Sequence, residues 1–333
     1  MTMARKSIIK CPLDFVSVPP LEKNFQNIHA KFDVLHHTII SYAVQPEALQ
    51  RFIHDRYTCE TFTDVDGADK ALLSVVISQS TPARLNRLEK FIDPPPYTSV
   101  SYRCLVMDKV FWYRSSWNFA AFMKSLFYSK FSRKVYGLPL FHAQVDLNQR
   151  FDMDLMRYTQ FDVASDGENG VGKLNISIED TGTPLLEAPP YVGFDTNESM
   201  LAALALPCET VTRGEGNCLY RQGAQCTPFS PSVGHLKQCT AMSYITDTLG
   251  IPDMEATKPH SVLLQYRVED MQTLEVETFV EDENDPHNAS QNTGMSARIQ
   301  RKAMNRAFAF RDHLRDKYYA GEEARGNGAD TKP

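Results

Sequence analysis

The sequence has no apolar run close to the roughly 20 residues that a membrane-spanning helix requires. Its 333 residues carry a formal net charge of −6, so it also lacks the basic excess that is typical of nucleic-acid-binding proteins. The N-terminal stretch MTMARKSIIKCPLDFVSVPP contains basic residues but only a broken apolar run, which makes a poor secretory signal. We therefore expect a cytoplasmic protein that binds neither membranes nor nucleic acids.

Metal-binding and phosphate-binding motifs are also missing. The seven cysteines include no CxxC pair, which disfavours a structural zinc site, and their odd number is typical of free thiols. His36 and His37 are adjacent, and in a strand they would point to opposite faces, so they are poorly placed to share one ion. There is no GxGxxG motif, P-loop or GxSxG elbow. We expect neither a metal nor another cofactor.

Most of the chain has the pattern of strands and turns. Residues 32–44 and 70–81 are rich in β-branched side chains, as central strands are. Two strand-like runs at 100–108 and 109–117 follow a proline-rich connector, and the run at 208–226 resembles a glycine-centred hairpin. Further strands are expected within 140–180 and 259–281.

Four segments have the pattern of helices. Residues 45–53 begin with Pro46 at a first-turn position, and residues 118–136 repeat apolar side chains every three or four positions, with Gly137 and Pro139 as a stop. Residues 235–251 and 296–319 are also predicted to be amphipathic helices. Many strands without a regular alternation with helices predict an α+β fold with a large antiparallel sheet.

The segment SRKVYGLPLFHA (132–143) resembles the helix-to-strand junction of the acetoacetate decarboxylase-like superfamily. It is most similar to the DUF2071 or YqjF-like branch, whose junction reads GLPYFHA. Segments 42–53, 99–116 and 249–269 resemble the same branch more weakly and in the same order. The resemblance implies a closed, cone-like antiparallel β-barrel with helices at its rim and a small-molecule cavity. The single domain that it implies spans residues 31–320. The composition of the flanking residues separately predicts an N-terminal arm (1–30) and a disordered tail (321–333).

The chain departs from the decarboxylases at the position that matters most for their chemistry. In that family the Gly-x-Pro turn is followed by two lysines, the first of which forms a Schiff base with the substrate. Leu140 and Phe141 occupy these positions here, and neither can form an imine. Lys130 and Lys134 fall on the polar face of the predicted helix. We therefore expect chemistry without a Schiff-base lysine.

His142 and Arg103 are the residues that we expect to be catalytic. His142 follows Leu140 by two positions, so the two side chains share a face of a strand, and an imidazole there could act as a general acid or base. The alternative is a buried histidine that only holds the junction together. Arg103 lies in an apolar strand and could clamp a carboxylate or enolate, unless it faces outward and pairs with an acidic neighbour.

Leu140, Tyr113, Arg114 and Tyr158 complete the expected substrate-binding set, although Arg114 lies near a strand end where a surface role is the alternative. One hypothesis is a lyase, isomerase or cyclase that acts on a carbonyl-bearing or polyketide-like metabolite by acid-base chemistry. Another is a non-catalytic binding protein for an apolar metabolite. A weaker third is an interaction module that docks through residues 296–319. A small molecule is the expected partner, and a homo-oligomer is possible.

Overall fold

Strands dominate the part of the chain that the computed structural model describes, which is residues 28–85, 96–109, 112–126, 129–130, 133, 138–205, 209–214, 218–227, 229–274 and 277–280. The strands are β1 (Ile28–Val44), β2 (Tyr57–Cys59), β3 (Thr61–Thr63), β4 (Asp69–Ser80), β5 (Arg84–Leu85), β6 (Tyr97–Asp108), β7 (Arg114–Met123), β8 (Leu140–Asp152), β9 (Arg157–Gly167), β10 (Leu174–Pro184), β11 (Thr210–Arg213), β12 (Cys218–Gln222), β13 (Ala224–Gln225), β14 (Ser232–Met242), β15 (Ser261–Leu274) and β16 (Glu277–Val280).

Few helices accompany these strands in the described ranges. They are α2 (Pro46–Gln50), α4 (Asn197–Leu204), two 3₁₀ turns, η2 (Glu168–Gly170) and η3 (Leu185–Glu187), and a π-helix, η4 (Tyr244–Thr248). None of the helices described is long and apolar enough to cross a membrane. The molecule is therefore mostly sheet, and the expected α+β class with helices at the rim fits only loosely.

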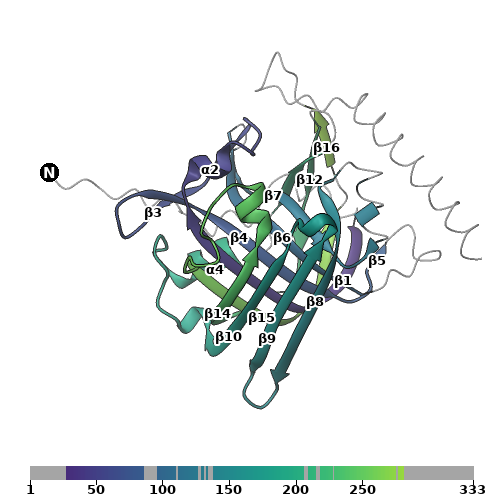
Figure 1. Ribbon diagram of the computed structural model, residues 1–333, viewed down its shortest axis with the longest axis vertical. Coiled ribbons are helices and arrows are strands. Elements are labelled where there is room, and N and C mark those ends of the chain that lie inside the picture. The colour runs from purple at the N-terminus through teal and green to yellow at the C-terminus, as the bar shows by residue number, and fades with distance from the viewer. Residues whose placement is uncertain are drawn as a thin grey trace, which may run out of the picture.

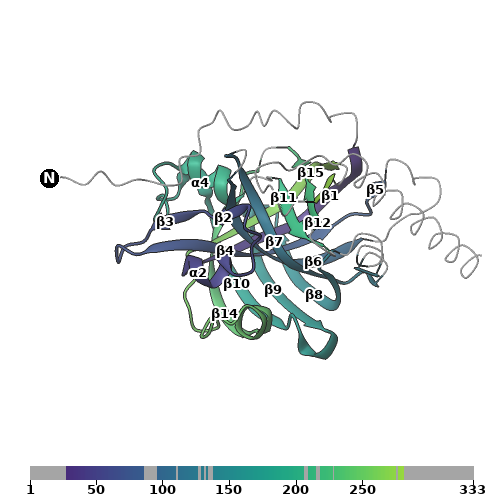
Figure 2. The same cartoon turned by 90° about the horizontal axis from the view of Figure 1, so that it is seen from above.

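Nine strands form a ring. Their pairing runs β7–β8–β9–β10–β14–β15–β1–β4–β6 and returns from β6 to β7. All these pairs are antiparallel except β7–β8, in which Ala121 pairs with Leu140 in parallel. A second parallel pairing joins β11 to β7, so that β11 and β12 lie beside the ring (Figures 1 and 2).

The main hydrophobic core fills the inside of this ring. Each of the nine strands contributes alternate side chains to it, as the twofold period of a strand requires. On β4 and β6, for example, Val75, Ile77, Val100 and Tyr102 are fully buried in this core. The residues between them face the other side of the sheet, and that outer side carries the cavity described below.

The structure confirms several of the predicted elements. Residues 32–44 lie within β1, residues 70–81 largely coincide with β4, and Pro46 starts α2 at its first turn. The glycine-centred hairpin is also present, because β11 and β12 pair antiparallel. The predicted C-terminal helix, N-terminal arm and tail lie almost entirely outside the described residues.

Two of the predicted helices are wrong in whole or in part. The helix expected from Asn118 starts later, because residues up to Met123 belong to β7 and helical backbone is described only at Leu126, Ser129, Lys130 and Arg133. The strand is buried on both faces, so its apolar side chains lose the twofold alternation that would have identified it. The helix expected at 235–251 is instead the second part of β14 followed by η4.

Candidate active site

A cavity of about 360 Å³ lies against the outer side of β1, β4, β6 and β7. Residues of β11, β12 and β13, the end of α4, and Phe229 line its other side. The start of β8 closes one edge through Leu138, Pro139 and Leu140. Its volume lies within the range of small-molecule sites.

Strand alternation determines which side chains reach the cavity. On β6, Val100 and Tyr102 point into the ring core, so Ser99, Ser101 and Arg103 point outward to the cavity. The same alternation on β4 turns serines to the cavity. Hydroxyl groups therefore dominate its polar lining, and they belong to Ser74, Ser78, Ser80, Ser99, Ser101, Ser116, Thr210, Thr212, Thr273, Tyr97 and Tyr220.

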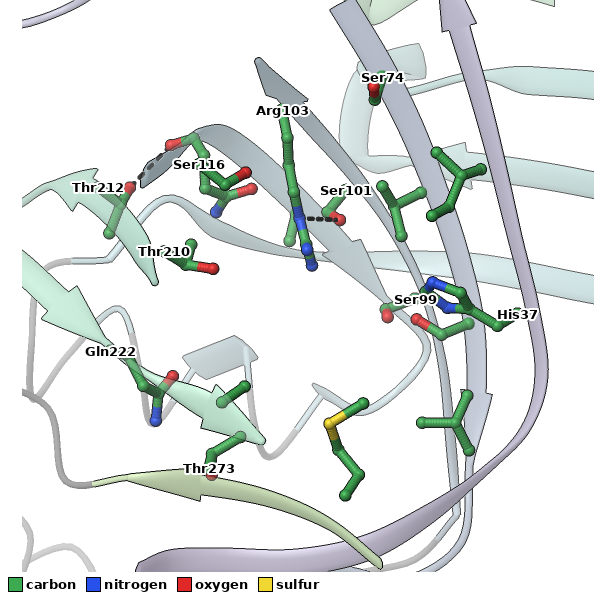
Figure 3. A pocket seen from close by; sticks show the side chains of 18 of the residues that line it. His37, Ser74, Ser99, Ser101, Arg103, Ser116, Thr210, Thr212, Gln222 and Thr273 are labelled. Atoms are coloured by element: carbon green, nitrogen blue, oxygen red, sulfur yellow. Dashed lines mark hydrogen bonds between the residues drawn. The ribbon is translucent and has the colours of Figure 1, made fainter. Parts of the chain in front are cut away.

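Arg103 is the only charged residue among the described residues that line the cavity. Its side chain extends into the space between the two walls, and its Nε donates a hydrogen bond to Ser101 Oγ at 3.0 Å (Figure 3). Burial raises the pKa of Tyr97, although a hydrogen bond with Ser80 and the charge of Arg103 act in the opposite direction. The site is therefore a hydroxyl-lined cavity with a guanidinium inside it.

His37 is the titratable base of this cavity. Burial and, second, the charge of Arg103 lower the pKa of His37 to about 3, so its imidazole is neutral at physiological pH. The ring lies edge-on to Phe229, with 5.5 Å between the ring centroids. Its Nδ1 is buried and has no hydrogen-bond partner, and no hydrogen bond joins its Nε2 to another described residue. A neutral imidazole with the proton on Nδ1 can accept a proton at Nε2.

His36 faces the opposite way, into the ring. Its Nδ1 lies 2.9 Å from the Tyr158 hydroxyl and its Nε2 lies 2.8 Å from the amide nitrogen of Gln149. Burial lowers the pKa of His36 to about 4. The expectation that the two adjacent histidines point to opposite faces is thus confirmed. In the described ranges, no group of three or more His, Cys, Asp or Glu residues is placed to hold a metal ion.

Two of the residues expected from the sequence lie at the cavity. Arg103 and Leu140 both line it. Leu140 therefore occupies the cavity edge at the position where the resemblance would place a Schiff-base lysine. Lys130 is exposed, and Lys134 lies outside the described residues.

His142 is not among the residues that line the cavity. It shares the face of Leu140 on β8, as expected, but the next residues on that face, Gln144 and Asp146, are exposed. The cavity therefore reaches β8 only at its first residue, and half-buried His142 lies between the cavity edge and the surface.

Tyr113 and Arg114 also lie outside the lining, in buried polar contacts at the far end of β7. Arg114 makes a bidentate ion pair with Glu60, in which its Nε lies 2.6 Å from Oε2. The Tyr113 hydroxyl donates to Glu209 Oε1 at 2.9 Å and accepts a hydrogen bond from Arg221 Nη1 at 2.6 Å. These contacts join the start of β7 to the β2–β3 segment and to the β11–β12 hairpin, which positions one wall of the cavity.

Tyr158 belongs to the ring core instead. Its hydroxyl contacts His36 and lies 3.3 Å from the carbonyl oxygen of Gln265, to which it donates. Burial raises the pKa of Tyr158, so it stays a neutral phenol. Its place in this internal chain of hydrogen bonds separates it from the cavity that contains Arg103.

Sequence reasoning missed His37 and the serines. The available signal was a serine at every second position of β6 (Ser99 and Ser101, on either side of fully buried Val100) and of the end of β4 (Ser78 and Ser80, after fully buried Ile77). Serines alternating with apolar residues in two paired strands indicate a polar face that is nevertheless covered. His37 falls on that same face of β1, because it pairs with Ser78.

No protein-family model matches the chain, and no curated protein matches it. Among solved structures it resembles the enduracididine biosynthesis enzyme MppR complexed with pyruvate (13% identity, TM-score 0.47, covering 75% of this chain and 90% of that one). It also resembles an acetoacetate decarboxylase from Legionella pneumophila subsp. pneumophila str. Philadelphia 1 (14%, 0.47, 77% and 89%). Another acetoacetate decarboxylase gives 12% identity and a TM-score of 0.46, with 82% and 98% coverage.

Identities and TM-scores this low carry no argument about the family, the fold or the chemistry of this chain, so the superfamily stays a prediction. The narrower DUF2071 or YqjF-like branch stays a prediction. What the site can do therefore follows from its own residues, which are a guanidinium, a neutral imidazole and many hydroxyl groups around one cavity.

Proposed function

We propose that this protein is an enzyme that moves a proton on a small carbonyl-bearing carboxylate, without a covalent imine. One observation carries the proposal: the Arg103 guanidinium and the neutral His37 imidazole face the same cavity of about 360 Å³. A guanidinium recruits a carboxylate through paired hydrogen bonds, and a neutral imidazole can accept a proton. The reaction class is an isomerisation, a cyclisation or a related lyase reaction that passes through an enolate.

In the proposed step, the substrate carboxylate binds Arg103 and His37 Nε2 removes a proton from the carbon next to the carbonyl. The electron pair of that C–H bond forms a carbon–carbon double bond, and the carbonyl π electrons move to oxygen. The enolate oxygen accepts hydrogen bonds from cavity hydroxyls, which stabilise the developing charge. Return of the proton to the same or another carbon completes the cycle, so no other reactant is needed.

The bound carboxylate also strengthens the base. After burial, the positive charge of Arg103 contributes to the low pKa of His37. A carboxylate on Arg103 offsets that charge and raises the pKa of the imidazole toward its ordinary value. His37 thus becomes a better proton acceptor when a substrate anion is present.

An imine mechanism is not part of the proposal. It requires an amine at the cavity, and Leu140 lies at the position where the resemblance would place the Schiff-base lysine. Burial also raises the pKa of Cys104, which lines the cavity, so this thiol stays protonated and is a poor covalent nucleophile.

The test is exchange of substrate hydrogens for solvent deuterium. Pyruvate, 4-oxopentanoate and 5-oxohexanoate are incubated with the protein in deuterium oxide, and ¹H NMR follows the loss of the signals next to each carbonyl. We expect exchange with at least one compound above the protein-free rate, and a fall of roughly 100-fold or more in His37→Gln. Binding of these acids without any exchange would instead make this a binding protein, as the alternative hypothesis states.

A matched variant separates the two candidate histidines. His142→Gln removes the imidazole that the sequence singled out, at a position outside the cavity lining. The proposal expects exchange to survive in His142→Gln and to be lost in His37→Gln. The reverse pattern would assign the base to His142 and contradict the role given to His37.

A further inference from the structure

The strand register arranges the floor of the cavity in rows. Ser74 on β4 pairs with Arg103 on β6, and four residue pairs further along the strands Ser78 pairs with Ser99. On the other side of β4, His37 of β1 pairs with Ser78. His37, Ser78 and Ser99 therefore form one row across three adjacent strands, and we call these three residues the far row.

The far row has polar atoms that nothing in the described part of the protein satisfies. No hydrogen bond joins the hydroxyls of Ser78 or Ser99, or Nε2 of His37, to another described side chain or backbone group, and the three residues are half-buried at the cavity. Half-buried polar groups that open on a cavity usually serve a ligand or bound water.

The serines nearer to Arg103 are already engaged. Ser74 Oγ lies 2.8 Å from Ser41 Oγ, and Ser101 Oγ accepts the hydrogen bond from Arg103 Nε. Open hydrogen-bonding capacity among the serines of β4 and β6 is therefore concentrated at Ser78 and Ser99.

The spacing between Arg103 and the far row determines how far apart the two polar groups of a ligand must be. The Arg103 side chain bends along β6 to Ser101 (Figure 3). From the Ser101 position to the Ser99 position is two residues, which is about 6.7 Å in a strand. We take a carboxylate on the guanidinium and an oxygen on the far row to lie about one such strand repeat apart, on carbons of the ligand that do not adjoin.

We infer that the substrate is a bifunctional acid whose carboxylate binds Arg103 and whose carbonyl, several bonds away, binds Ser78 and Ser99 beside His37. This inference rests on the proposed function for the role of His37 and adds the spacing of the two groups. A 4-oxo or 5-oxo acid meets this spacing, whereas a 2-oxo acid, in which carboxylate and carbonyl adjoin, does not. The reaction then takes place at the carbonyl end of the ligand, away from the carboxylate.

The experiment measures binding, so that its result does not depend on turnover. Dissociation constants of pyruvate, 4-oxopentanoate and 5-oxohexanoate are obtained by NMR titration for the wild type, for Ser78→Ala/Ser99→Ala and for Ser74→Ala. Ser74→Ala is the matched control, because it removes a hydroxyl from the same cavity wall whose hydrogen bond is to Ser41. Far-ultraviolet circular dichroism and thermal unfolding verify that each variant is folded.

We expect at least one of the two longer acids to bind about tenfold more tightly than pyruvate, and the double variant to lose that advantage, since two neutral hydrogen bonds account for a change of this size. Ser74→Ala should retain the preference. Equal binding of all three acids, or an unchanged preference in the double variant, overturns the inference even if exchange occurs. If the wild type prefers the longer acids and the double variant does not, but no exchange occurs, the result supports the inference and overturns the proposed function.

Discussion

His36 and His37 should make the folded protein sensitive to acid. The pKa of His36 is lowered to about 4 and that of His37 to about 3, from an ordinary value of 6.5. Because both folded pKa values lie below the unfolded one, the unfolded state binds more protons between about pH 6.5 and about pH 4. The free energy of unfolding therefore decreases as the pH falls through this window.

The size of the effect follows from the same pKa values. At about pH 5, an unfolded histidine is almost fully protonated, whereas His37 in the folded protein is almost fully neutral. The resulting loss of stability between about pH 7.5 and about pH 5 is about 2 kcal/mol for each of the two histidines. The hydrogen bonds of His36 agree with a neutral ring, since Nε2 accepts from Gln149 while Nδ1 donates to Tyr158.

Urea unfolding at the two pH values measures this directly for the wild type, His36→Gln and His37→Gln. Only the change in unfolding free energy between the two pH values is compared, so any constant cost of a substitution cancels. We expect this loss to be smaller by about 2 kcal/mol in each variant than in the wild type. If His37→Gln loses as much stability as the wild type, His37 is not held neutral by its surroundings and the reasoning fails.

Three further substitutions test the packing against Phe122 and a buried ion pair. Gly172→Ala should destabilise the fold by about 2 to 4 kcal/mol, because a Cβ there would lie 2.4 Å from the Phe122 ring at a φ of +76°. Gly170→Ala, with the same φ and open space, should cost clearly less in the same urea titration, and equal costs would contradict the clash. Arg56→Leu should cost about 3 to 5 kcal/mol, because it leaves the Asp108 carboxylate buried without its ion pair, and a change below about 1 kcal/mol would refute this.

Much of the sheet could be predicted from the sequence, because β-branched runs such as residues 32–44 and 70–81 form strands wherever they can be buried. The helix expected from Asn118 failed for a physical reason. β7 lies between the ring core and the cavity, and a strand buried on both faces carries apolar residues without the alternation that identifies it. That position depends on neighbours far away in the sequence, which local periodicity does not contain.

Only part of the candidate site could be predicted from the sequence. Strand alternation placed His142 on the face of Leu140 correctly, but it does not tell where a cavity ends along that face. It also predicted that His36 and His37 would point in opposite directions without indicating which side would be covered. The wall formed by β11 and β12 covers the side that His37 faces. β11 joins this wall to β7 through a short parallel pairing, which no local sequence pattern predicts.

The most direct test of the central claim is chemical rescue of the guanidinium. Arg103→Ala removes the cation from the cavity, and the exchange of 4-oxopentanoate and 5-oxohexanoate hydrogens in deuterium oxide is measured with and without added guanidinium chloride. The account predicts a loss of roughly 100-fold or more in exchange rate, partly recovered by guanidinium and not by sodium chloride. Exchange at the wild-type rate in Arg103→Ala would contradict it.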